Sequence, residues 1–187
     1  MSDIVNVTFT ALELRVPDTS ERIVEGIVVP WGETSYLTPD PNGERFRPGS
    51  LTRTITERGD RVKLYRNHDH NTAVGKSVQW KNTKAGMWGQ FRIANTPHGD
   101  AVLAEIQEGM LDAFSVGFVP KREARGEDGA REVIEAQLHE VSITPMGAYD
   151  GARVLAVRNP NTVRSTLSPM PAVNLSPLVL PSRWPTV

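Results

Sequence analysis

Short apolar segments separated by turn-forming residues limit most strongly what this chain can fold into. The segments 7–10 and 12–16 alternate apolar with polar residues, as a strand with one buried face does. Similar strand-like segments follow at 22–29, 62–65, 74–80, 87–93, 113–119, 133–143 and 153–157. Helical spacing is predicted at only two places, from Ser50 to Gly59 and over residues 100–110.

The order of these segments favours one fold class. Strands do not alternate regularly with helices, which disfavours a doubly wound parallel sheet. Neither glycine-rich phosphate-binding pattern, GxxxxGK(S/T) or GxGxxG, occurs in the chain. We therefore predict an α+β protein, with a mainly antiparallel sheet that closes or nearly closes into a β-barrel and a few helices around it.

The amino-acid composition excludes several kinds of chemistry and partner. The 187 residues include no cysteine, so disulfides, thiolate metal sites and a cysteine nucleophile are excluded. Basic and acidic side chains nearly balance, 21 against 22, so no overall field favours nucleic acid or an anionic membrane. The first residues lack a leader pattern, and no apolar run is long enough to span a bilayer. We expect a soluble protein that is not exported.

The last part of the chain differs from the rest in charge and proline content. Residues 159–187 contain Arg164 and Arg183 but no acidic residue, and six of the 14 prolines lie there. Proline removes a backbone donor and holds the preceding residue in extended conformations, which disfavours packing into a core. We predict a folded domain over residues 1–158 and a flexible tail over residues 159–187, with a docking peptide as the alternative for the tail.

A pair of histidines follows one of the predicted strands. His68 and His70 lie just after the segment 62–65, where they could be solvated, act as a base or bind a metal. A metal would need a further ligand such as His98 or His139, and the spacing matches no recognised ligand set.

A serine lies among small residues in the segment 112–119. Alternation places Phe114, Val116 and Phe118 on one face, while Ser115 shares the other face with alanine and glycine. That small face fits either the approach of a substrate backbone or a closely packed crossing of strands. Residue 113 is alanine, so this is not the GxSxG turn of the α/β-hydrolases.

A glutamate lies within the apolar strand predicted near residue 140. Glu140 shares a face with Leu138 and Ser142, and if that face is inward the carboxylate requires a partner, for which a histidine would be suitable. In the alternative, Val141 and Ile143 face the core and Glu140 faces solvent.

Together these features resemble a known family, the prohead proteases of tailed phages that process HK97-like capsids. The resemblance covers about residues 22–158 as an ordered series of short motifs: Glu25-Gly26-Ile27, Pro30-Trp31-Gly32, Phe46-Arg47-Pro48-Gly49-Ser50-Leu51, Val62 to Asp69, Val74-Gly75-Lys76, Ile106 to Leu111, Phe114 to Phe118 and Leu138 to Ile143. The family is similar in fold to the herpesvirus assemblins, which are serine proteases built on a barrel wrapped by helices.

The resemblance implies a catalytic triad without a cofactor or a metal. In it Ser115 is the nucleophile, His68 the general base and Glu140 the acid that orients the imidazole. Two choices stay open: His70 competes with His68, and Asp69 and Asp112 compete with Glu140. We expect the segment from Pro145 to Arg153 to contribute to the oxyanion hole.

The resemblance also implies substrates, partners and a location. A serine endopeptidase of this family would cleave scaffold and the scaffold-like extension of the major capsid protein, and also itself, inside the procapsid in the host cytoplasm. A homodimer is implied by analogy with the assemblins, while neither nucleic acid nor a membrane is expected as a partner. The alternative function is a non-catalytic capsid assembly or binding module on the same fold, and a weaker one is a metal-dependent hydrolase that uses His68 and His70.

Overall fold

The computed structural model describes residues 22–158. The predicted strands at 7–10 and 12–16 and the proline-rich tail at 159–187 lie outside these residues, so the division into domain and tail stays a prediction. In chain order the elements are β1 (Ile23–Pro30), β2 (Glu44–Phe46), α1 (Thr52–Arg58), a 3-10 turn η1 (Gly59–Arg61), β3 (Lys63–Arg66), β4 (Ala73–Asn82), β5 (Gly86–Ile93), α2 (Pro97–Gln107), β6 (Ala113–Arg125), β7 (Arg131–Thr144) and β8 (Val154–Arg158). No helix within the described range is both long and apolar enough to cross a membrane.

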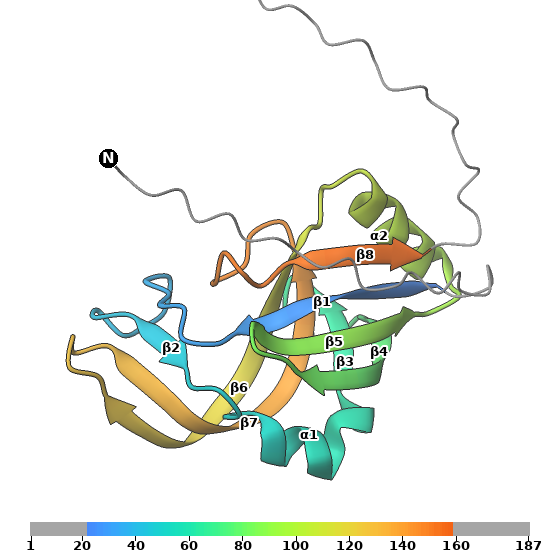
Figure 1. Cartoon of the computed structure of the whole chain (residues 1–187). Helices are drawn as coiled ribbons and strands as arrows, with labels where there is room; N and C mark the ends of the chain where they lie inside the picture. The colour runs from blue at the N-terminus through green and yellow to red at the C-terminus, as the bar shows by residue number, and fades with distance from the viewer. Residues whose placement is uncertain (1–21, 159–187) are drawn as a thin grey trace, which may run out of the picture.

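The strands form one curled sheet of eight strands. Its order is β2-β7-β3-β4-β5-β1-β8, and β6 pairs with β7 outside this path (Figure 1). Five strand pairs are antiparallel, whereas β7 pairs in parallel with both β2 and β3. The prediction of a mainly antiparallel sheet is therefore confirmed.

The predicted barrel is correct only in part. The sheet curls into a half-barrel. Its two ends, β6 and β8, meet only through a single bridge between Ala113 of β6 and Arg153, the residue just before β8. The Phe114 N–H donates to the Ala152 carbonyl at 2.7 Å beside this bridge. Beyond Ala113, β6 is hydrogen-bonded along β7 as a long ribbon that reaches toward β2. Because β6 and β8 pair only near Ala113, the barrel is not continuously closed.

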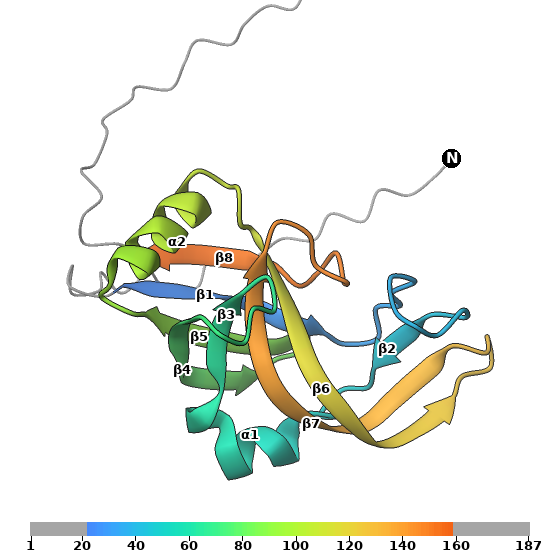
Figure 2. The same ribbon diagram turned by 180° about the vertical axis from the view of Figure 1, so that it is seen from behind.

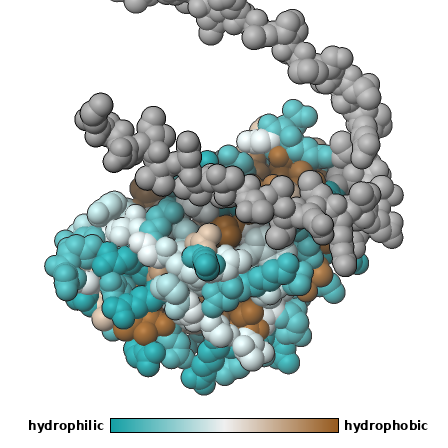
Figure 3. Space-filling model, in the orientation of Figure 1, coloured by the Kyte–Doolittle hydropathy of each residue, from teal (hydrophilic) through white to brown (hydrophobic). Residues whose placement is uncertain are grey.

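The core lies inside the curl of the sheet. Alternating residues of β1, β3, β5, β6 and β7 point inward, where their burial removes apolar surface from water. The largest fully buried side chains are Phe46, Phe91, Phe114, Ile23, Leu51, Leu64, Met87, Ile93, Leu103, Leu138, Ile143 and Val24. On the surface seen in Figure 3, hydrophobic residues form small separate patches, in keeping with this apolar interior.

Both predicted helices are present, and each starts at a different residue from the one expected. The start of α2 is Pro97, and the Thr96 hydroxyl caps it by accepting from the Gly99 N–H at 3.1 Å. The predicted start at Asp100 is therefore three residues too late. Ser50 does not cap α1, because the cap position falls on Leu51 and no side chain bonds there. The two helices lie at opposite ends of the sheet in Figures 1 and 2.

Candidate active site

Three neighbouring strands carry the polar residues that the sequence singles out. In the view from behind in Figure 2, β6, β7 and β3 lie side by side, with β7 in the middle. The register places Ser115 of β6 opposite Ser142 of β7, and Gly117 opposite Glu140. Because residues opposite each other share a face of a sheet, these four residues lie on one face. Phe114 and Val141 point the other way, into the core.

His68 is supplied by the turn that follows β3. Asn67 and His68 have φ angles of 52° and 58°, which lie in the left-handed region that few non-glycine residues adopt. The Asn67 N–H donates to the Ile143 carbonyl at 3.1 Å, which ties this turn to β7. Asparagine tolerates the left-handed region better than most residues, which fits Asn67. Such backbone strain persists where the surroundings fix it, and here it turns the imidazole of His68 over the sheet face.

The imidazole of His68 bridges the serine and the glutamate. Its Nε2 lies 2.8 Å from Ser115 Oγ, and its Nδ1 lies 2.7 Å from Glu140 Oε1. The Glu140 side chain is 4% exposed, whereas that of His68 is 44% exposed, so the acid is buried and the ring is open to solvent. A carboxylate can only accept a hydrogen bond, so Nδ1 carries the proton and Nε2 is free to accept the serine proton.

Ser142 completes this network, although sequence reasoning gave it no role. Its hydroxyl donates to Glu140 Oε2 at 3.0 Å and accepts from the backbone N–H of His68 at 3.0 Å. Ser142 is fully buried. One hydroxyl therefore positions the acid and the backbone of the base together. Its place two residues after Glu140, on the same strand face, was the signal that could have revealed it.

Gly117 provides the space that the Glu140 carboxylate occupies. A Cβ atom at position 117 would lie 2.6 Å from Glu140 Oε1 and 3.1 Å from its Cγ. The small residue at this position thus reflects close packing against the acid, which is one of the two interpretations of the small strand face.

We expect Gly117→Ala to reduce peptidase activity on the order of 10²-fold, because a displacement of about 1 Å in catalytic geometry has an effect of this size. The added methyl would push Glu140 Oε1 away from His68 Nδ1 without replacing any of the proposed catalytic residues. The matched control is Val119→Ala on the same strand, whose side chain is 44% exposed. Steady-state cleavage of a fluorogenic peptide measures both, and equal activity of the two variants would show that this contact does not matter.

The other candidates from the sequence lie apart from Ser115. The His70 ring contacts the ring of Tyr65, with centroids 5.3 Å apart, and it has no described contact with the serine. Asp69 accepts from the Asn71 N–H at 3.0 Å, and this bond lowers the pKa of its carboxyl group. His98, Asp112 and His139 are exposed. Among the residues described, no three histidine, aspartate or glutamate side chains gather as a metal site.

A pocket of about 290 Å³ opens beside Ser115. Its wall is largely apolar and includes Leu37, Pro39, Val116 and Phe118. Ala148 and Tyr149 also line it, so part of the 145–153 segment borders the serine, while the oxyanion donors stay a prediction.

Glu44 is a buried acid in the wall of this pocket. Tyr149 Oη donates to Glu44 Oε1 at 3.0 Å, and the Arg131 guanidinium lies 3.1 Å from Oε2. Burial raises the pKa of Glu44 and that of Tyr149. Because Glu44, Tyr149 and Arg131 are already paired with one another, much of the pocket surface left for a ligand is apolar.

A serine hydroxyl on an imidazole that is held by a carboxylate is the arrangement of a serine hydrolase, here on a curled, strand-rich fold. The family model of the caudovirus prohead serine proteases matches residues 10–166, and the chain belongs to this family. No curated protein sequence matches the chain.

The fold is similar to that of a solved phage protease. The capsid assembly protease of bacteriophage T4 aligns with a TM-score of 0.51 and 16% identity, covering 65% of this chain and 80% of that protein. The KSHV protease, solved with a hexapeptide phosphonate inhibitor, gives a TM-score of 0.46 and 15% identity, covering 71% and 63% of the two chains. The varicella-zoster virus protease gives 0.41 and 13%, covering 71% and 62%.

Proposed function

We propose that this member of the prohead protease family is a serine endopeptidase with Ser115 as nucleophile, His68 as general base and Glu140 as the orienting acid. The observation that carries the proposal is the His68 ring, whose two nitrogens lie within 2.8 Å of Ser115 Oγ and Glu140 Oε1. Both distances are in the range for proton transfer and orientation before substrate binds.

The contacts support a two-stage acyl transfer. Ser115 Oγ attacks the peptide carbonyl carbon while its proton moves to His68 Nε2, and Glu140 stabilises the imidazolium that forms. The imidazolium then gives this proton to the leaving amine as the peptide bond breaks. Water, deprotonated by the same imidazole, hydrolyses the acyl-serine ester and regenerates the hydroxyl.

The substrates that we propose are scaffold and the scaffold-like extension of the major capsid protein, together with this chain itself. Membership of the prohead protease family supports this choice, as does the fold shared with the capsid assembly protease of bacteriophage T4. Cleavage would then take place inside the procapsid in the host cytoplasm. The apolar pocket beside Ser115 is where we place a substrate side chain, because its volume of about 290 Å³ exceeds the ~150 Å³ that holds benzene in an engineered cavity. The homodimer stays a prediction.

Active-site labelling tests the proposal directly. A fluorophosphonate probe is expected to form one covalent adduct, on the peptide that contains Ser115, because only an activated serine reacts with it. Ser50→Ala is a matched control, since the Ser50 hydroxyl is buried and has no hydrogen-bond partner in the described part of the chain. That variant should label like the natural protein, as measured by intact and peptide mass spectrometry.

Two other results would contradict the assignment. A folded protein with no adduct would favour the non-catalytic assembly module. Loss of peptidase activity with a chelator, without any labelling of Ser115, would favour a metal-dependent hydrolase.

A further inference from the structure

Three cations lie in one row across three neighbouring strands, away from the candidate active site. Lys63 of β3 is opposite Lys76 of β4, and Lys76 is opposite Arg92 of β5. All three are exposed, and within residues 22–158 none of them forms an ion pair. Like charges directly opposite each other destabilise a sheet. This cationic row therefore has a cost in stability that no acid among the described residues offsets.

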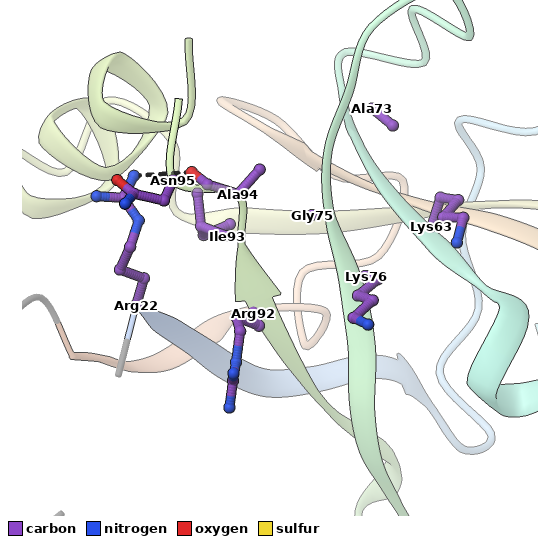
Figure 4. Close-up of a pocket in the computed structure, with 9 residues that line it drawn as sticks. All are labelled: Arg22, Lys63, Ala73, Gly75, Lys76, Arg92, Ile93, Ala94 and Asn95. Atoms are coloured by element: carbon purple, nitrogen blue, oxygen red, sulfur yellow. Dashed lines mark hydrogen bonds between the residues drawn. The ribbon is translucent and has the colours of Figure 1, made fainter. Parts of the chain in front are cut away.

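The cationic row borders a hollow of about 490 Å³ whose floor is made of small residues. Lys63, Lys76 and Arg92 line it together with Ala73, Gly75 and Ala94, and no acidic residue takes part (Figure 4). At Gly75 a Cβ atom would lie 2.5 Å from the Arg92 carbonyl oxygen, so the close pairing of β4 with β5 requires a residue without a side chain here. Because Lys76 and Arg92 are opposite each other in the register of β4 and β5, their side chains share one face of the sheet.

A fourth cation closes one end of the hollow. Arg22 is 8% exposed, donates to the Ala94 carbonyl at 2.9 Å and lies 2.6 Å from Asp100 Oδ1. Its Nε is buried and has no hydrogen-bond partner in the described part of the chain. A buried donor without a partner is uncommon.

The cationic row lies on the same face of the sheet as the candidate active site. Tyr65 is opposite Ser142, which is opposite Ser115. Lys63 precedes Tyr65 by two residues and so points to the same face, and Lys76 and Arg92 follow across the sheet. From strand spacing and rise, the row is roughly 10 to 20 Å from Ser115. A polypeptide of a few extended residues spans that distance.

We infer that this row is a docking site for an acidic segment of a polypeptide substrate, an inference that rests on the proposed protease function. Carboxylates at intervals along an extended segment would pair with Lys63, Lys76 and Arg92 while the segment runs on toward Ser115. Nucleic acid fits less well, because no aromatic side chain lines the hollow for base stacking and the chain as a whole has a net charge of −1. Docking would raise the local concentration of the scissile bond at the serine.

Binding to full-length Ser115→Ala protein tests the inference without cleavage. The probe is a fluorescein-labelled peptide of six glutamates alternating with serine, and fluorescence anisotropy gives its Kd at 50 mM and 300 mM NaCl. We expect the triple variant Lys63→Gln, Lys76→Gln, Arg92→Gln to weaken binding about tenfold, since each exposed ion pair contributes modestly. Binding should also weaken at the higher salt concentration, because exposed charges are screened.

The control removes the same charge elsewhere. Lys84, Lys121 and Arg122 are exposed and form no described ion pair, so changing all three to glutamine should leave the Kd within about twofold of the starting protein. Equal loss in the two triple variants would mean that only overall charge matters, and it would overturn the inference. So would a peptide that does not bind, or a 12-nucleotide single strand of DNA that binds more tightly than the peptide and loses affinity only in the row variant.

The inference and the proposed function fail in different ways. If the natural protein is labelled at Ser115 but the Ser115→Ala protein does not bind the acidic peptide, the docking site is refuted and the protease function stands. If the protein binds the peptide through the cationic row but is not labelled at Ser115, the acidic-peptide site stands and the protease function is refuted.

Discussion

Replacing Ser115 with alanine is expected to abolish cleavage of a capsid protein that carries its scaffold-like extension. The change removes the hydroxyl that lies 2.8 Å from His68 Nε2, so no covalent intermediate can form on it. Loss of a triad nucleophile lowers the rate by on the order of 10⁴-fold or more, which in a co-expression assay leaves only unprocessed protein. Gel electrophoresis and mass spectrometry of the capsid protein measure the result.

The same variant must keep its fold for that result to be informative. Ser115 is half-buried, and no hydrogen bond of its hydroxyl other than the one to His68 is described, so its removal should change the thermal unfolding midpoint little. Circular dichroism and thermal denaturation check this. Normal processing by a folded Ser115→Ala protein would end the assignment of the nucleophile.

Changing Glu140 to glutamine is expected to lower kcat by on the order of 10⁴-fold, the effect seen when a triad acid becomes an amide. A glutamine can present its NH₂ group to His68 Nδ1, which favours the tautomer with the proton on Nε2. That nitrogen then cannot accept the Ser115 proton. Steady-state kinetics with a fluorogenic peptide measure the loss, which should fall on kcat more than on KM because the acid does not touch substrate.

Glu135→Gln is the matched control for that experiment. Glu135 lies on the same strand, β7, where its carboxylate is 3.3 Å from Arg53 at the surface. A surface ion pair of this kind contributes little, so activity should stay near that of the unchanged protein. If Glu140→Gln retained a tenth or more of the activity, Glu140 would not be the orienting acid.

Much of the fold follows from local pattern. The strand-like segments at 22–29, 62–65, 87–93 and 113–119 correspond to β1, β3, β5 and β6, because alternation of apolar and polar residues reports directly which face of a strand is buried. The pattern fails where pairing continues without burial. β6 runs to Arg125, and its last residues are exposed, so only hydrogen bonds to β7 mark them as strand.

For the candidate triad, too, some features follow from the sequence and others only from strand pairing. The ordered motifs single out Ser115, His68 and Glu140, whereas the burial of Glu140 was open, because an acid in an apolar strand can face either way. The structure shows Glu140 and Ser142 buried beside an exposed His139. Gly117 gained its role from the register of β6 on β7, which places it opposite Glu140. Ser142 gained its role from the pairing of β3 with β7, which brings the backbone N–H of His68 to its hydroxyl.

The sequence by itself determined the strand-rich class and the absence of thiol chemistry, since these depend on residue type and local periodicity. The three residues worth testing came from the resemblance of its ordered motifs to the prohead proteases. The tertiary structure alone decided which imidazole meets the serine, how the acid is held, and that three cations share one row. Those outcomes depend on strand register and on the left-handed turn at Asn67 and His68, which long-range pairing fixes and which short-range pattern does not encode.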